Sequence, residues 1–190
     1  MDFNFILRLA TLIIFAVWRS YWLLTKKNAA IKKPKTETTK RSIESVMIIF
    51  SGAYIIVNLI GFTLLPFHNL YIQTIGFILV ALGFIQAMTA RKTLSDNWTE
   101  SYEYQIKKDH ELITKGIYQY VRHPIYGGLI LMPTGALLVS GSYTFFIGLI
   151  IMLFAAEIFA RREEKLLTKH FGKKYIEYMK TTKKFIPFVY

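Results

Sequence analysis

Five apolar runs dominate this sequence and limit what the chain can fold into. They cover residues 3–24, 43–65, 70–90, 125–140 and 143–160. The first three are close to the ~20 residues that an α-helix needs to cross a bilayer. A hydrophobic content of 53% and a mean hydropathy of +0.34 are also higher than soluble domains usually have. We therefore predict an all-α, polytopic integral membrane protein with about five transmembrane helices.

The last two runs are separated only by Gly141 and Ser142, which predicts a tight helical hairpin near the C-terminus. Pro133 interrupts the first arm of this hairpin and predicts a kinked or tilted helix there. We interpret residues 1–190 as one domain. Residues 1–90 would supply three transmembrane helices, and residues 91–190 would supply a cytoplasmic loop, the hairpin and a charged C-terminal helix.

The basic residues are concentrated in three segments, and this pattern predicts an orientation in the membrane. Of the 24 Lys and Arg residues, 22 lie in residues 26–41, in residues 91–122 and from residue 161 onward. The loops "PFHN" and "SGSY" contain none. Because basic loops stay on the cytoplasmic side, we predict an outside N-terminus and a cytoplasmic C-terminus. The same loops explain the net charge of +12 without a nucleic-acid partner.

The motif Arg122-His123-Pro124 stands directly before the fourth apolar run. A residue before proline avoids the α-helical region, and proline is favoured in the first turn of a helix. The motif therefore predicts His123 as a helix cap, with free amides that can bind a carboxylate or phosphate. Gly127 and Gly128 would let a flat ligand approach the backbone. The alternative is that these residues serve only interfacial anchoring and helix packing.

Charged and aromatic residues flank the hairpin on the same predicted side of the membrane. Before it, His110 is either an acid, a base or a structural residue, and Tyr118 is either a ligand contact or an interfacial anchor. After it, Glu157 and Arg161 are four residues apart and can pair on one helix face. The cluster that follows, "RREE", contains both signs of charge within one turn. Some of these side chains are therefore expected to face a neighbour or a ligand. The alternative is a solvated helix whose charges form salt bridges with one another.

The ordered set of motifs resembles the isoprenylcysteine carboxyl methyltransferase family and its prokaryotic relatives. The likeness rests on "HELITKGIYQYVRHPIYGG", the apolar hairpin, "RREEKLLTKHFGKKYIEY" and "FIPF". It implies a methyltransferase that uses S-adenosylmethionine and releases S-adenosylhomocysteine. The cofactor would be enclosed by the loop before the fourth helix, the start of that helix and the charged turn after the fifth. The methyl acceptor would be a lipid-modified, prenylcysteine-like carboxylate that enters from the bilayer.

The resemblance also assigns roles to individual residues. Glu163 would accept hydrogen bonds from the cofactor and act at the catalytic centre, Tyr118 would pack on the adenine, and the amides of His123 and Tyr126 would hold the cofactor's carboxylate. The family's substrate-binding arginine falls at Phe159 in this chain, so Arg161 or Arg162 would take its place. The full set of implied cofactor contacts is Glu103 or Gln105, His110, Glu111, Leu112, Ile113, Tyr118, His123, Pro124, Ile125, Tyr126 and Glu163.

The expected chemistry requires little beyond positioning. An ionised carboxylate acceptor needs neither a metal nor a strong base, whereas an amine acceptor, as in phospholipid methylation, needs a base such as His110 or Glu163. The lack of cysteine excludes disulfides, thiolate nucleophiles and cysteine-bound metals. Two other classes stay open: an NADPH-dependent membrane reductase and a helical membrane scaffold without activity. The oligomeric state has no signature in the sequence.

Overall fold

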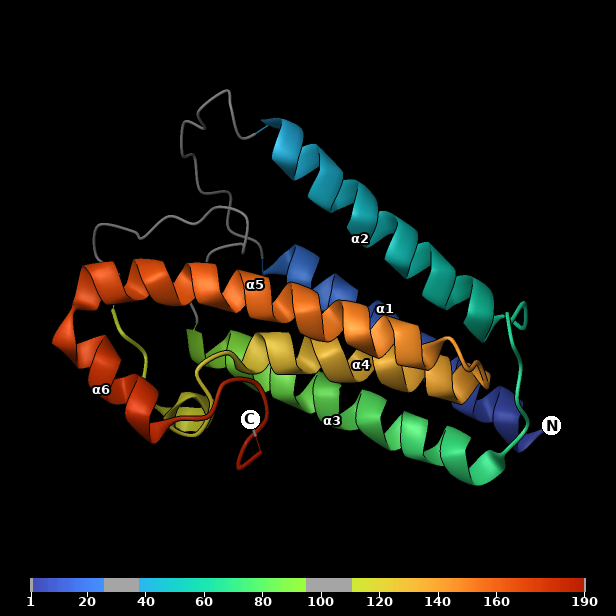
Figure 1. Cartoon of the computed structure of the whole chain (residues 1–190). Helices are drawn as coiled ribbons and strands as arrows, with labels where there is room; N and C mark the ends of the chain where they lie inside the picture. The colour runs from blue at the N-terminus through green and yellow to red at the C-terminus, as the bar shows by residue number, and fades with distance from the viewer. Residues whose placement is uncertain (1, 26–37, 95–110, 190) are drawn as a thin grey trace. The chain divides into compact units, whose positions relative to one another are not determined.

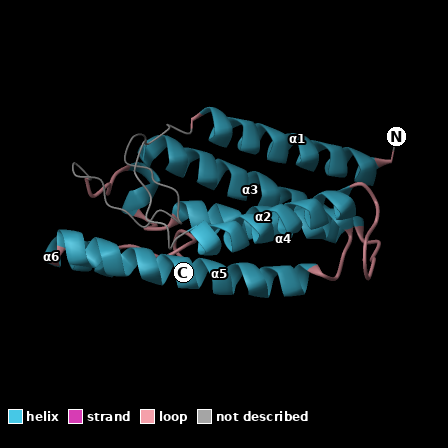
Figure 2. Ribbon diagram, turned by 90° about the horizontal axis from the view of Figure 1, so that it is seen from above, coloured by secondary structure: helices cyan, strands magenta, loops and turns pink. Residues whose placement is uncertain are grey.

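The computed structural model describes residues 2–25, 38–94 and 111–189, with the backbone alone for residues 38–48. Every regular element in these ranges is a helix, as Figure 2 shows. The predicted all-α class is therefore confirmed. In chain order they are α1 (Phe3–Leu24), α2 (Thr38–Leu59), α3 (Leu70–Leu94), the 3-10 helix η3 (Gly116–Gln119), α4 (Pro124–Ser140), α5 (Phe145–Phe171) and α6 (Lys173–Thr181) (Figure 1).

The helix ends agree with the apolar runs to different degrees. The bounds of α1 coincide with the predicted run. In contrast, α2 ends at Leu59, and Gly61 follows with a positive φ of 113°, a conformation that glycine tolerates best. The predicted span to residue 65 is therefore too long. Helix α5 continues through the charged segment to Phe171, because Arg, Glu, Lys and Leu all favour helices.

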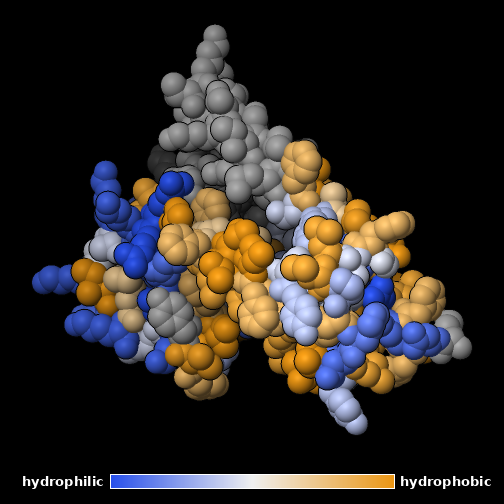
Figure 3. Space-filling model, turned by 45° about the vertical axis from the view of Figure 1, so that its right-hand side comes forward, coloured by the Kyte–Doolittle hydropathy of each residue, from blue (hydrophilic) through white to orange (hydrophobic). Residues whose placement is uncertain are grey.

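Within the described residues, the helices that are long and apolar enough to cross a membrane are α1 and α3. Helix α4 has 17 residues and continues through Pro133. The count of five transmembrane helices stays a prediction. Many apolar side chains nevertheless face outward, as the orange surface in Figure 3 illustrates. On α5 they include Phe146, Ile147, Ile150 and Phe154.

The chain forms two compact units, Met1–Ile78 with Gly135–Phe145, and Leu79–Thr134 with Phe146–Tyr190. In the first unit, the predicted hairpin turn is present, with Gly141 at a φ of 72°. The Phe67 amide donates to the Gly141 carbonyl at 2.6 Å. Arg8, an unfavourable residue for a transmembrane run, donates to the Ser140 carbonyl at 2.7 Å. This hydrogen bond supplies a polar partner for the guanidinium within an apolar environment.

In the second unit, the C-terminal half of α3 packs closely against the start of α4. A Cβ atom added at Gly83 would lie 2.9 Å from Leu131 Cβ, so the small residue allows the close approach. Gln86, on the same helix, donates to the carbonyls of Pro124 at 3.0 Å and Phe185 at 2.7 Å. The buried Gln86 amide therefore ties α3 to the start of α4 and to the C-terminal segment.

Candidate functional site

The loop before α4 is held by helix α6. Gly116, with a φ of 61°, forms the turn that leads into η3. Tyr118 in η3 is buried, and its backbone carbonyl accepts a 2.5 Å hydrogen bond from the Tyr178 hydroxyl. Figure 1 shows this loop in yellow beside the red α6. An aromatic ring of the loop is thereby fixed near the start of α4.

Residues 182–185, here called the strap, run beside the end of this loop. The Lys183 amide donates to the Tyr120 carbonyl at 2.9 Å, and the Arg122 amide donates to the Lys183 carbonyl at 3.0 Å. The His123 amide donates to the Lys184 carbonyl at 2.9 Å. The strap therefore satisfies backbone groups of the Arg-His-Pro motif that would otherwise be unpaired.

The imidazole of His123 lies between two carboxylates of α5. Its Nδ1 is 3.5 Å from Glu163 Oε2, and its Nε2 is 3.2 Å from Glu164 Oε1. The histidine side chain is only 3% exposed, whereas that of Glu163 is 44% exposed. Both ring nitrogens thus face an acceptor, which is the arrangement that favours the doubly protonated ring.

Two further cations complete a charged network around Glu164. Arg122 Nε is 2.7 Å from Glu164 Oε1, and Arg122 Nη1 donates to the Thr182 carbonyl at 2.6 Å. Lys184 Nζ is 3.7 Å from Glu164 Oε2 and 2.8 Å from each oxygen of Glu157. The strap, the Arg-His-Pro motif and α5 are therefore joined by ion pairs as well as by backbone hydrogen bonds.

The environment fixes the charges of these groups. Burial opposes the charged form of His123, but hydrogen bonds to Glu163 and Glu164 outweigh it and raise the pKa of His123. Burial likewise opposes ionisation of Glu164, yet hydrogen bonds from His123 and Arg122 lower its pKa to about 2. For Glu163, burial is outweighed by the hydrogen bond and charge of His123, with a further hydrogen bond from Tyr126, and its pKa is also lowered. Near neutral pH both glutamates are carboxylates.

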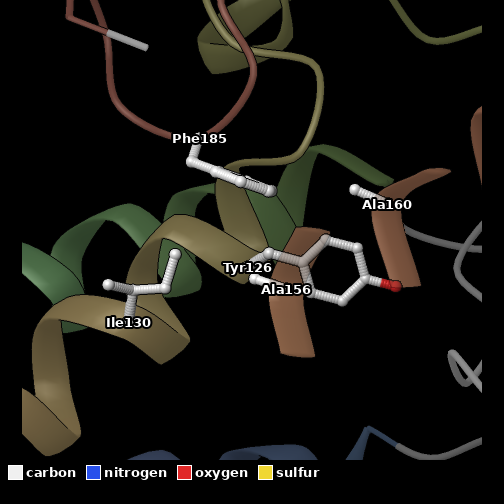
Figure 4. Packing of buried hydrophobic residues seen from close by; sticks show 5 residues of the cluster. All are labelled: Tyr126, Ile130, Ala156, Ala160 and Phe185. Carbon is white, nitrogen blue, oxygen red and sulfur yellow. The ribbon is translucent and has the colours of Figure 1, made fainter. Parts of the chain in front are cut away.

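An apolar cluster lies beneath the charged network. It contains Tyr126, Ile130, Ala156, Ala160 and Phe185, which come from α4, α5 and the strap (Figure 4). The Tyr126 ring centroid is 5.6 Å from that of His123. Tyr126 therefore joins the apolar cluster to the charged network, with its ring in the first and its hydroxyl at Glu163.

The structure brings several of the predicted site residues together. Tyr118, His123, Tyr126 and Glu163 are near one another, since His123 and Tyr126 contact Glu163 and the charge of Glu163 acts on the Tyr118 hydroxyl. The other predicted cofactor residues differ in exposure: Pro124 is buried, Leu112, Ile113 and Ile125 are partly exposed, and Glu111 is exposed. The predictions for Glu103, Gln105 and His110 fall outside the described residues.

The candidate substrate arginines lie on the exposed side of α5. Arg161 Nε is 2.6 Å from Glu157 Oε1, so the predicted pair is confirmed. Arg162 is exposed. Phe159, which stands where the related family has an arginine, is partly buried against the apolar cluster. Either arginine as a substrate ligand stays a prediction.

Two predictions about the start of α4 are wrong. A Cβ atom at Gly127 would lie 2.1 Å from both Gln86 Nε2 and the Phe185 carbonyl oxygen, so this glycine admits the strap and α3 instead of a ligand. Gly128 is likewise packed against Gly83 and Ala87 of α3. The His123 amide donates to the Lys184 carbonyl and is therefore not available for the carboxylate of a cofactor.

Three residues of the network, Arg122, Glu164 and Lys184, were not among the predicted site residues. Arg122 and Glu164 are adjacent to predicted residues, and their opposite charges in "RHP" and "RREE" were the signal that could have paired them. Lys184 had no such signal, because its partner Glu157 is 27 residues away and in another segment. Of the strap, only its last residue, Phe185, belongs to the recognised motif "FIPF".

The known proteins that this chain resembles are methyltransferases. The phospholipid methyltransferase (PEMT) family model matches residues 71–174. Protein-S-isoprenylcysteine O-methyltransferase B of Arabidopsis thaliana is 30% identical over 122 residues, which cover 63% of this chain and 61% of that protein. The enzyme of that name from Dictyostelium discoideum is 33% identical over 124 residues, or 60% of this chain and 48% of that protein. The chain thus matches less than two thirds of the length of either relative.

The fold also has a solved counterpart. The structure of a eukaryotic intramembrane Ras methyltransferase, isoprenylcysteine carboxyl methyltransferase, matches with a TM-score of 0.65 and 19% identity. The match covers 98% of this chain and 68% of the other. The predicted resemblance to isoprenylcysteine carboxyl methyltransferases is therefore confirmed. Since the family model matches more than half of the 190 residues, the chain belongs to the phospholipid methyltransferase family.

Proposed function

We propose that this chain transfers a methyl group from S-adenosylmethionine to the carboxylate of a lipid-modified, prenylcysteine-like substrate at the cytoplasmic face of a membrane. The observation that carries the proposal is the pairing of Glu163 with a buried, charged His123 beside Tyr118 and Tyr126. The isoprenylcysteine O-methyltransferases among its relatives point to the same acceptor class.

The described residues fit such a cofactor. S-adenosylmethionine has an ammonium group, a sulfonium, ribose hydroxyls and a flat adenine, which need negative acceptors and aromatic surfaces. Glu163 is ionised and 44% exposed, so its carboxylate can accept from the ammonium group or from the ribose. Tyr118 and Tyr126 supply aromatic rings near Glu163. The bound cofactor would supply an electrophilic methyl group on its sulfonium.

The protein's own residues would hold the reactants and exclude water. His123 is held in place by two carboxylates and keeps Glu163 ionised, so His123 would act as a positioning residue. Arg162 would bind the acceptor carboxylate, since it is exposed whereas Arg161 already pairs with Glu157. The apolar side chains exposed on α5 would face lipid, which would let a prenyl chain approach without leaving an apolar medium.

A phospholipid amine is the alternative acceptor, and the description of the matching family favours it. An amine must lose a proton during methylation. His123 is not available as the base, because both of its nitrogens face carboxylates and its raised pKa favours the ring that already carries the second proton. Glu163 would have to accept the proton.

The two acceptors can be separated with detergent-solubilised protein and S-adenosylmethionine labelled on its methyl group. We expect label in a base-labile ester of a farnesylated cysteine, and none in the same compound with its carboxylate converted to an amide. Phosphatidylethanolamine serves as the competing acceptor. Label on the aminolipid alone would support the alternative, and label on neither acceptor would refute both.

A further inference from the structure

Two neighbouring buried tyrosines of α6 differ in the hydrogen bonding of their hydroxyl groups. Tyr175 and Tyr178 are three residues apart, both are buried, and their ring centroids lie 5.8 Å apart. The Tyr178 hydroxyl donates to the Tyr118 carbonyl at 2.5 Å. The Tyr175 hydroxyl, in a side chain only 1% exposed, has no hydrogen-bond partner among the described residues.

An unpaired buried hydroxyl destabilises the folded state, so it is rarely retained without a use. Aromatic residues at a helical spacing usually pack, and this would account for the Tyr175 ring. Its ring does pack, but packing alone is served equally well by phenylalanine. The hydroxyl is therefore the atom that needs an explanation.

The surroundings of this hydroxyl connect it to the candidate site. Burial raises the pKa of Tyr175, and the charges of Glu164 and Glu163 raise it further, while Arg122 opposes them. The hydroxyl therefore stays protonated and can donate a hydrogen bond. The hydrogen bonds shown for Glu163 and Glu164 come from other donors, His123 and Arg122, and not from this hydroxyl. The Tyr175 ring packs against Tyr178, whose hydroxyl donates to the Tyr118 carbonyl, so this unpaired donor lies next to a residue that holds the loop of the candidate site.

We propose that the Tyr175 hydroxyl donates a hydrogen bond to an oxygen atom of the bound sulfonium nucleoside, and that Tyr175 is a further cofactor-binding residue. This inference rests on the proposed function, because it requires the cofactor to bind at Glu163. In the absence of the cofactor, the unpaired hydroxyl would not stabilise the fold and would carry the cost of its burial.

The variants Tyr175→Phe and Tyr178→Phe form a matched pair, since each removes one buried hydroxyl from the same face of α6. The readouts are the melting temperature of the ligand-free protein in detergent and the affinity for S-adenosylhomocysteine by calorimetry. For Tyr175→Phe we expect an unchanged or higher melting temperature and an affinity about 5- to 15-fold weaker. For Tyr178→Phe we expect a lower melting temperature, because the Tyr118 carbonyl loses its donor.

The outcomes distinguish the two proposals. If the wild-type protein does not bind S-adenosylhomocysteine, the proposed function fails and takes this inference with it. If the wild type binds and Tyr175→Phe binds with the same affinity, the role of Tyr175 is refuted while the proposed function stands. A lower melting temperature of ligand-free Tyr175→Phe, with unchanged affinity, would also refute it and would assign the hydroxyl to a buried water.

Discussion

Replacing Glu164 by glutamine is expected to lower the free energy of unfolding by about 3 kcal/mol, the largest stability effect that we predict. Glu164 is the shared partner of Arg122 at 2.7 Å and His123 at 3.2 Å, and its side chain is only 16% exposed. The neutral amide would leave two cations in a poorly solvated place. For a chain of this length the expected decrease in melting temperature is roughly 6–12 °C, measured by thermal unfolding in detergent.

The pH dependence of stability provides a second readout for the same variant. A lowered pKa stabilises the folded state above the usual pKa, and this contribution is lost as the pH falls through the folded value. For Glu164 the window runs from the ordinary 4.5 down to about 2. The acid decline of the wild type should therefore be shallower in Glu164→Gln. His123 acts in the opposite sense: its raised pKa gives stability below 6.5 that is lost as the pH rises.

Glu177→Gln is the matched control for this experiment, because Glu177 lies exposed on α6. We expect it to change stability by no more than about 0.5 kcal/mol. Equal effects of Glu164→Gln and Glu177→Gln would contradict the charged network described above.

Replacing Glu163 by glutamine is expected to weaken the binding of S-adenosylhomocysteine by about 10- to 100-fold. A hydrogen bond to a charged group is worth about 1.5–3 kcal/mol, and the amide keeps the shape of the side chain but not its charge. The effect on ligand-free stability should be smaller than for Glu164→Gln, because Glu163 is 44% exposed and does not contact Arg122 in the described structure. Calorimetry and thermal unfolding of both variants test this difference.

Substitutions of the two glutamates are therefore expected to affect different properties of the protein. Glu163→Gln should lose affinity more than stability, and Glu164→Gln should lose stability more than affinity for each folded molecule. Retention of wild-type affinity by Glu163→Gln would remove the central contact of the proposed site.

The sequence predicted the helices well where hydrophobicity alone sets their length. The bounds of α1 are those of its apolar run, because no special backbone conformation interrupts it. The predicted end of the second run was wrong, since the positive φ of Gly61 stops α2 while the apolar residues continue. Hydrophobic composition alone therefore does not show where such a turn ends a helix. Conversely, α5 continues beyond its apolar run because a helix does not require apolar residues once its side chains find other partners.

Part of the candidate site was predictable because local motifs carried it. Arg122-His123-Pro124 and "RREE" each concentrate charge at one end of an apolar run, and the hairpin brings those two ends together. The strap could not be placed in this way, because its position depends on backbone hydrogen bonds with residues about 60 positions earlier. The prediction for Gly127 was wrong for the same reason. The backbone that approaches this glycine is the Phe185 carbonyl of the strap.

The proposed function requires that Glu163, with Tyr118, His123 and Tyr126 near it, binds the sulfonium nucleoside. Hydrogen–deuterium exchange of the detergent-solubilised chain, with and without S-adenosylhomocysteine, tests it most directly. We predict slower exchange in residues 111–127 and 160–178 when the ligand is present, and no change in residues 3–24. Protection confined to residues 3–24, or no protection at any position despite measurable binding, would contradict the account.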